Sequence, residues 1–152
     1  MKWFTLCALV LALLSSNVEA QSLIPTQTDK QINCLALTVY HESRSLDLDQ
    51  QISVAWVVIN RTKNKKFPST ICKVVWQPNQ FTWTNVIKDY RPKDEKAWNK
   101  ANKIALLVYK NRLFDPTKGS NFFYEKNMKK PKWAYKMKIK YEGKHFIFLA
   151  MK

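Results

Sequence analysis

Residues 34–44 read Cys-Leu-Ala-Leu-Thr-Val-Tyr-His-Glu-Ser-Arg, an apolar stretch that runs directly into a glutamate. Its apolar positions recur at helical spacing, so we predict a helix from about Asp29 to His41 or Glu42. A helix that is apolar on most sides lies inside a protein. Glu42 therefore stands at the end of a buried helix, whereas most other glutamates of the chain sit among lysines, where solvent accounts for them.

A carboxylate at the end of a buried helix loses part of its hydration, which raises its pKa. A glutamate with a raised pKa holds a proton near neutral pH and donates it to a leaving group, as in lysozyme-type glycoside cleavage. The alternative is that Glu42 pairs with Arg44 or His41 at the surface and has no catalytic role.

The rest of the pattern predicts an α+β domain, with helices first and a small sheet last. Thr28 and Gln31 form a capping-box pattern at the start of the first helix. A second, core helix is predicted from a cap at Asp47 or Asp49 to about Arg61 or Lys63. Further helices are predicted at about 69–76 and 94–110, a loop at 77–92, a strand at 122–124 and a β-hairpin at 137–149.

The N-terminus has the pattern of a secretory signal peptide. Lys2 precedes an apolar run from Trp3 to Leu14, and Val18-Glu19-Ala20 is a small-residue cleavage site. We predict cleavage after Ala20, which leaves 21–152 as a single domain without a stable membrane anchor; the alternative is an uncleaved anchor. The protein is then exported to the periplasm or cell wall.

The chain is strongly basic, with 26 Lys and Arg against 11 Asp and Glu, a formal charge of +15. Such a charge predicts an anionic partner. An exported protein meets the anionic polymers of the cell envelope first. A nucleic-acid partner is not predicted, because the sequence has no arginine-rich arm, zinc-finger spacing or aromatic RNA-binding motif.

Two cysteines, Cys34 and Cys72, remain after signal cleavage. An even number in an exported protein favours a disulfide, and two reduced, buried thiols are the alternative. No metal site or other cofactor is predicted. His41 and His145 are the only histidines, and neither His-x-x-x-His nor Cys-x-x-Cys occurs.

An ordered set of motifs resembles the SleB-like cell wall hydrolases, the catalytic-domain family of spore cortex-lytic enzymes. The set spans roughly 34–148, nearly the whole mature chain. Its parts are Cys34–Arg44, Gln51–Arg61, Phe67–Gln77, Gln80-Phe-Thr-Trp83, Asp115-Pro-Thr-Lys-Gly-Ser-Asn-Phe-Phe-Tyr124, Trp133 and Gly143-Lys-His145.

The resemblance implies a lysozyme-like fold and cleavage of peptidoglycan glycan strands, by a lytic transglycosylase or a muramidase-type hydrolase. The catalytic glutamate of the family falls on Glu42. This chain departs from the usual Glu-Ala-Arg-Gly-Glu, because it has Ser45 in place of the glycine and Leu46 in place of the second acid. A lytic transglycosylase tolerates that loss, since no second carboxylate has to position a water. A bacterial enzyme and an exported phage endolysin both fit the sequence.

Sugar binding requires aromatic faces and polar groups around the acid. Tyr40, Phe81, Trp83 and Tyr124 are candidate platforms, with core packing as their alternative. Candidate polar contacts are Asn60, Gln80, Arg44 and His145. If a second carboxylate exists, the candidates are Asp47, Asp49, Asp89 and Asp115.

Other classes of function remain open at this point. A thiol peptidase or amidase could pair Cys34 or Cys72 with His41 or His145. A non-catalytic, basic peptidoglycan-binding protein is the second alternative, and a nucleic-acid binder is the third. Glu42→Gln leaves a simple binder unaffected, which separates it from the enzyme.

Overall fold

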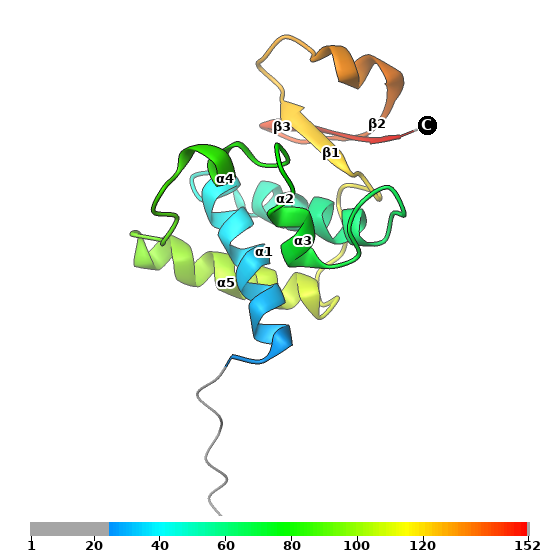
Figure 1. Ribbon diagram of the computed structural model, residues 1–152. Helices are drawn as coiled ribbons and strands as arrows, with labels where there is room; N and C mark the ends of the chain where they lie inside the picture. Colours follow the sequence, from blue (N-terminus) through cyan, green and yellow to red (C-terminus); the bar gives the residue numbers. More distant parts are fainter. Residues whose placement is uncertain (1–24, 152) are drawn as a thin grey trace, which may run out of the picture.

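The computed structural model describes residues 25–151, so the predicted signal peptide lies outside the described residues. Within them, five α-helices precede a three-stranded sheet (Figure 1). The elements are α1 (Gln27–Ser43), α2 (Leu48–Thr62), α3 (Ile71–Val75), α4 (Thr82–Val86), α5 (Glu95–Tyr109), β1 (Phe122–Glu125), the 3-10 helix η1 (Lys132–Lys136), β2 (Met137–Glu142) and β3 (Phe146–Met151). The predicted α+β class is confirmed.

Helix α1 is the centre of the helical layer. It packs against α2, α3 and α5, and its residues from Cys34 to Tyr40 are all buried. The capping box at its start lies two residues earlier than predicted, at Thr26 and Asp29 rather than Thr28 and Gln31. The Thr26 hydroxyl accepts a hydrogen bond from the Asp29 amide, and the Asp29 carboxylate accepts one from the Thr26 amide. Thr28 therefore lies inside the helix.

Helix α2 is the core helix that the sequence predicts. Asp47 caps it by accepting a hydrogen bond from the Gln50 amide. One side, with Trp56 and Val58, joins the core of the helical layer, and another, with Val54 and Val57, packs against β3. Because both sides are covered, α2 connects the helices to the sheet.

The sheet has the antiparallel order β1-β3-β2. The predicted hairpin is β2-β3, and β1 pairs with the other edge of β3, with Phe122 opposite Leu149. A Cβ at Gly143 in the turn would collide with the end of the Gln50 side chain, so a larger residue there would require that side chain to move. The side-chain amide oxygen of Gln50, Oε1, accepts hydrogen bonds from the backbone amides of His145 and Phe146. This contact fixes the hairpin against the start of α2.

Two short helices were not predicted. Residues 77–92 were expected to be a loop, but Thr82–Val86 form α4, and Lys132–Lys136 form η1. Neither has a side-chain cap, and each is one turn long, so tertiary packing rather than local sequence determines them. Within the described residues, no helix has the length and apolar character needed to cross a membrane.

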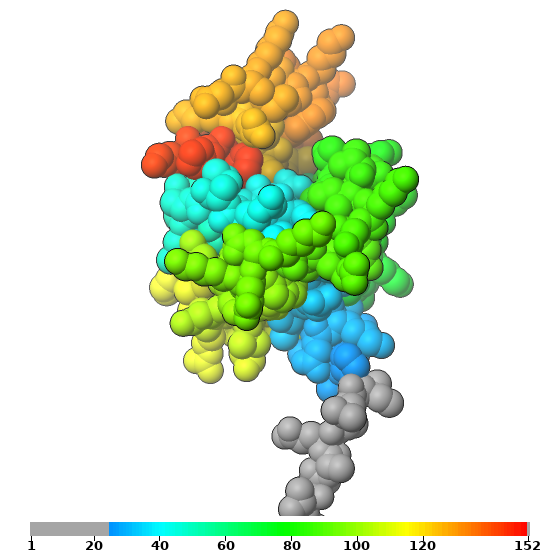
Figure 2. Space-filling view, turned by 90° about the vertical axis from the view of Figure 1, so that its left-hand side faces the viewer, coloured from blue at the N-terminus to red at the C-terminus, as the bar shows by residue number. Residues whose placement is uncertain are grey.

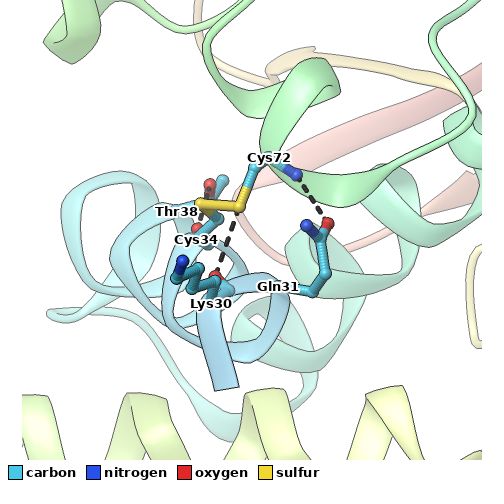
Figure 3. Close-up of a disulfide and its surroundings, with 5 residues drawn as sticks. All are labelled: Lys30, Gln31, Cys34, Thr38 and Cys72. Atoms are coloured by element: carbon cyan, nitrogen blue, oxygen red, sulfur yellow. Dashed lines mark hydrogen bonds between the residues drawn. A yellow bond between two sulfur atoms is a disulfide. The ribbon is translucent and has the colours of Figure 1, made fainter. Parts of the chain in front are cut away.

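A disulfide joins α1 to α3. Cys34 and Cys72 are bonded, with their Cα atoms 5.3 Å apart, and Gln31 accepts a hydrogen bond from the Cys72 amide beside them (Figure 3). Both sulfurs are therefore in a covalent bond. The thiol peptidase hypothesis is wrong for these two residues, because a disulfide sulfur is not a thiolate nucleophile.

Candidate active site

Glu42 lies in the last turn of α1, where two cavities meet beside the sheet. The first, which we name the His145 cavity, has a volume of about 270 Å³. The second, the Gln80 cavity, has a volume of about 260 Å³. Three residues line both: Glu42, Glu125 and Phe146. The first cavity is completed by Ser45, Leu46, Asn127 and His145, and the second by Arg61, Gln80, Phe81, Thr82, Phe123, Tyr124 and Met128.

The electrostatics of Glu42 are those of a proton donor near neutral pH. Burial raises the pKa of its carboxyl to about 7, Arg61 opposes the shift, and the negative charge of Glu125 adds to it. No hydrogen-bond donor of the described residues contacts this carboxylate, so nothing close replaces the lost water. A carboxyl with a pKa near neutrality is able to donate and accept a proton in turn.

Arg61, in α2, is the cation whose charge lowers the pKa of Glu42. It is only 4% exposed, and its Nε donates a 2.8 Å hydrogen bond to the Asn121 carbonyl oxygen. Burial lowers its pKa to about 10, and Glu42 counteracts that shift. Three aromatic rings lie within 6 Å of the guanidinium: Phe67, Phe81 and Phe122. The sequence analysis names Arg61 only as the approximate end of the second helix. An arginine inside a predicted core helix was the signal that could have identified it as a site residue.

Glu125, at the end of β1, is a second carboxylate beside Glu42 and was not among the predicted acids. Leu46, which replaces the acid of the resembled family, lines the same His145 cavity. Leu46 also packs against the apolar cluster of Val54 and Val57. Strand β1 therefore supplies a carboxylate, Glu125, to the His145 cavity, where Leu46 stands in place of the usual acid.

The four predicted second acids have other partners and line neither cavity. Asp47 caps α2, Asp49 accepts a 2.6 Å hydrogen bond from the Tyr141 hydroxyl, and Asp89 pairs with Arg91 at 2.8 Å. Asp115 accepts hydrogen bonds from the Thr117 and Gly119 amides and organises its own loop. None of the four is placed to act with Glu42.

Four of the predicted sugar-binding residues line the cavities around Glu42: Gln80, Phe81, Tyr124 and His145. Phe81 and Tyr124 are only 2% and 8% exposed, so they form walls rather than open stacking faces. Gln80 is half-buried and is one of the polar residues that line the Gln80 cavity. The Nε2 atom of His145 lies 3.9 Å from the Asp47 carboxylate.

The other four predicted residues have structural contacts and line neither cavity. Tyr40 is buried, and its hydroxyl accepts hydrogen bonds from the Lys93 and Asp94 amides. Trp83 is buried and stacks on His41 at 4.5 Å. These two residues pack the core, which was the alternative prediction for them.

Asn60 and Arg44 also lie elsewhere. The Asn60 amide donates to Asp115 at 2.9 Å and to the Ser120 carbonyl oxygen at 3.2 Å, so it anchors the 115–120 loop to α2. The Arg44 guanidinium lies 4.9 Å from the centre of the Tyr40 ring and borders a separate cavity of about 210 Å³. Arg61 rather than Arg44 is therefore the arginine of the Glu42 site.

Comparison with known proteins places this architecture in a family. The Cell Wall Hydrolase family model matches residues 47–148, a range that begins after Glu42. The spore cortex-lytic enzyme of Bacillus cereus is 31% identical over 121 residues, covering 79% of this chain and 44% of the relative. That of Halalkalibacterium halodurans is 29% identical over 134 residues, covering 87% of this chain and 39% of the relative. The chain thus spans about two fifths of the length of these relatives.

Solved structures agree with the sequence comparison. The catalytic domain of the Bacillus cereus SleB protein superimposes with a TM-score of 0.63 at 25% identity, over 78% of this chain and 88% of that one. The catalytic domain of the germination-specific lytic transglycosylase SleB from Bacillus anthracis gives a TM-score of 0.66 at 25% identity, over 82% and 95%. The chain belongs to the cell wall hydrolase family and has the lysozyme-like fold of the SleB catalytic domain.

Proposed function

We propose that this protein is an exported, peptidoglycan-degrading enzyme of the lytic transglycosylase type. It cleaves the glycan strand between N-acetylmuramic acid and N-acetylglucosamine, with Glu42 as the acid and then the base. The observation that carries the proposal is the half-buried Glu42 carboxyl, which borders two cavities and has a pKa of about 7. Family membership and the name of the Bacillus anthracis relative support the same chemistry.

In the first step, protonated Glu42 donates its proton to the glycosidic oxygen. The bond from that oxygen to the anomeric carbon of N-acetylmuramic acid breaks, and N-acetylglucosamine leaves with a new hydroxyl. The anomeric carbon then carries positive charge. Burial of the carboxyl favours this step, because it keeps the proton on Glu42 at neutral pH.

In the second step, ionised Glu42 removes the proton from the C6 hydroxyl of the same muramic residue. The oxygen attacks the anomeric carbon and closes a 1,6-anhydro ring, so water is not a reactant. Arg61 favours the ionised form of Glu42 and thus opposes the effect of burial. The pKa of Glu42 near 7 balances the two states that the cycle needs.

Product analysis tests this proposal directly. Purified sacculi are digested with the protein from Gln21 onward, and the released muropeptides are analysed by mass spectrometry. We expect products one water lighter than those of a lysozyme, and a yield from Glu42→Gln that is lower by about a hundredfold or more. If well-folded protein releases no glycan fragment, the enzymatic proposal is wrong and wall binding without catalysis takes its place.

A hydrolytic muramidase is the second candidate, and Glu125 is the observation that favours it. Hydrolytic glycosidases use two carboxylates, one as acid and one as base or nucleophile. Glu125 borders both cavities together with Glu42, and no cation of the described residues lies within 4.0 Å of it. In the transglycosylase route, the same charge has the smaller role of holding the proton on Glu42.

Glu125→Gln separates the two roles. If Glu125 acts only through its charge, its loss lowers the pKa of Glu42, because a neighbouring negative charge disfavours ionisation. The alkaline limb of the pH–rate profile then moves to lower pH, and the anhydro products remain. If Glu125 activates water, cleavage falls by about 10²-fold or more and hydrated products disappear. The profile of kcat/KM and the product masses, measured on the same samples, decide between these outcomes.

A further inference from the structure

The segment 126–144, which we name the lysine lobe, carries a concentrated positive charge. It comprises the turn after β1, η1, β2 and the hairpin turn. Glu142 is its one acidic residue, and its eight lysines are Lys126, Lys129, Lys130, Lys132, Lys136, Lys138, Lys140 and Lys144. Figure 2 shows the long side chains of this part of the chain, in orange, projecting from the top of the molecule.

Most of this charge has no partner within the described residues. Lys126 lies 3.8 Å from Glu142, and no other lysine of the lobe has a carboxylate within 4.0 Å. Lys130 lies over the ring of Tyr135 at 4.8 Å, so an aromatic side chain is part of the same surface. Trp133 and Tyr135 are 42% and 63% exposed. Like charges gathered in one short segment repel one another, and an external anion relieves that repulsion.

The lobe is continuous with the Glu42 site. Asn127 lines the His145 cavity and Met128 lines the Gln80 cavity, and both residues belong to the turn that opens the lobe. The Lys126 amide also donates a 2.8 Å hydrogen bond to the His145 carbonyl oxygen. A polymer that occupies the cavities therefore meets the lysines as it leaves them.

Protection of the sheet edge does not account for this surface. β2 is an outer strand of the sheet, and lysines on such a strand prevent pairing with other chains. That role applies to Lys138 and Lys140. Lys129, Lys132, Lys136 and Lys144 are exposed and lie outside the strands, so edge protection gives no reason for them.

We propose that the lysine lobe binds the carboxylates of the peptide stems that branch from the peptidoglycan strand. The inference rests on the proposed function and extends it with a second contact to the same polymer. Lysine suits this ligand, because its charge sits on a flexible stem and tolerates variation in the position of each carboxylate. Single exposed ion pairs are weak, so several of them on one polymer are needed for useful affinity.

Cosedimentation with insoluble sacculi tests the proposal. Both variants are made in Glu42→Gln protein so that the polymer stays intact. The lobe variant replaces Lys129, Lys132, Lys136 and Lys144 with glutamine; the control replaces Lys65, Lys66, Lys96 and Lys100, which are equally exposed and lie outside the lobe. The two proteins have the same net charge. We expect the lobe variant to bind about tenfold more weakly at physiological salt, with the control within twofold of the parent.

Sacculi stripped of their peptide stems by an amidase identify the ligand. We expect the parent and the lobe variant to bind the stripped glycan equally weakly. A tenfold difference that persists on stripped glycan overturns the proposal, because another wall polyanion is then the ligand. Equal weakening of lobe variant and control also overturns it, since net charge alone then explains binding. If the parent protein cleaves no glycan but its binding to sacculi still depends on the lobe, the lysine lobe remains the binding surface. Only the proposed enzymatic function is then wrong.

Discussion

Glu42→Gln is expected to reduce glycan cleavage by about 10²–10⁴-fold, the usual contribution of general acid–base catalysis. Glutamine keeps the shape of the side chain but neither donates the proton nor accepts it later. In the parent protein, the rate is expected to fall as pH rises above about 7, because Glu42 then enters the first step without its proton. Digestion of sacculi across pH 5–9 measures both effects.

The same substitution is expected to stabilise the folded protein at alkaline pH. The pKa of Glu42 is raised from 4.5 to about 7 in the folded state, so the folded state binds the proton more tightly than the unfolded state does. Below pH 4.5 the group is protonated in both states and has no effect. Between pH 4.5 and 7 the parent loses stability as pH rises, and above pH 7 the loss is on the order of 3 kcal/mol.

Urea unfolding of the parent and Glu42→Gln at pH 4 and pH 8 tests this. We expect equal free energies of unfolding at pH 4 and a more stable variant at pH 8. His145→Gln is a control in the same cavity, because it changes another polar lining side chain and leaves Glu42 in place. A parent and a Glu42→Gln protein of equal stability at pH 8 would contradict the buried, proton-holding state of Glu42.

Removal of the disulfide has the second large expected effect. Cys34 and Cys72 are 38 residues apart in the chain, and the bond that joins them restricts the unfolded state. The double variant Cys34→Ala, Cys72→Ala is expected to lose about 3–4 kcal/mol of unfolding free energy on the chain-entropy account. Activity at low temperature is expected to persist, since neither cysteine lines a cavity with Glu42.

Denaturant unfolding with and without a reductant measures this contribution. We expect the reductant to destabilise the parent and to leave the double alanine variant unchanged. A second comparison concerns chemistry. If the double variant folds but its digestion of sacculi falls as far as that of Glu42→Gln, a cysteine takes part in the reaction and the Glu42 mechanism is incomplete.

The sequence determined those features that depend on neighbouring residues. Apolar periodicity placed α1, α2 and α5 to within about two residues, the start signal after Pro68 placed α3 equally well, and alternation placed the β2-β3 hairpin. The apolar run before Glu42 also predicted a carboxyl that loses part of its hydration and has a raised pKa; Glu42 is half-buried, and burial raises its pKa to about 7. The apolar periodicity within a helix predicts which of its positions are buried, so a local sequence pattern is sufficient to predict helix burial.

Only the tertiary structure decided which side chains surround Glu42. Arg61 and Glu125 are far from Glu42 in the chain, and they meet it because α2 and β1 pack beside the end of α1. The same packing gave Tyr40, Asn60 and Trp83 buried contacts of their own, although their residue types suit sugar binding. The type of a residue determines the chemistry that its side chain is able to perform. The neighbours of that side chain depend on long-range packing, which the local periodicity of the sequence does not predict.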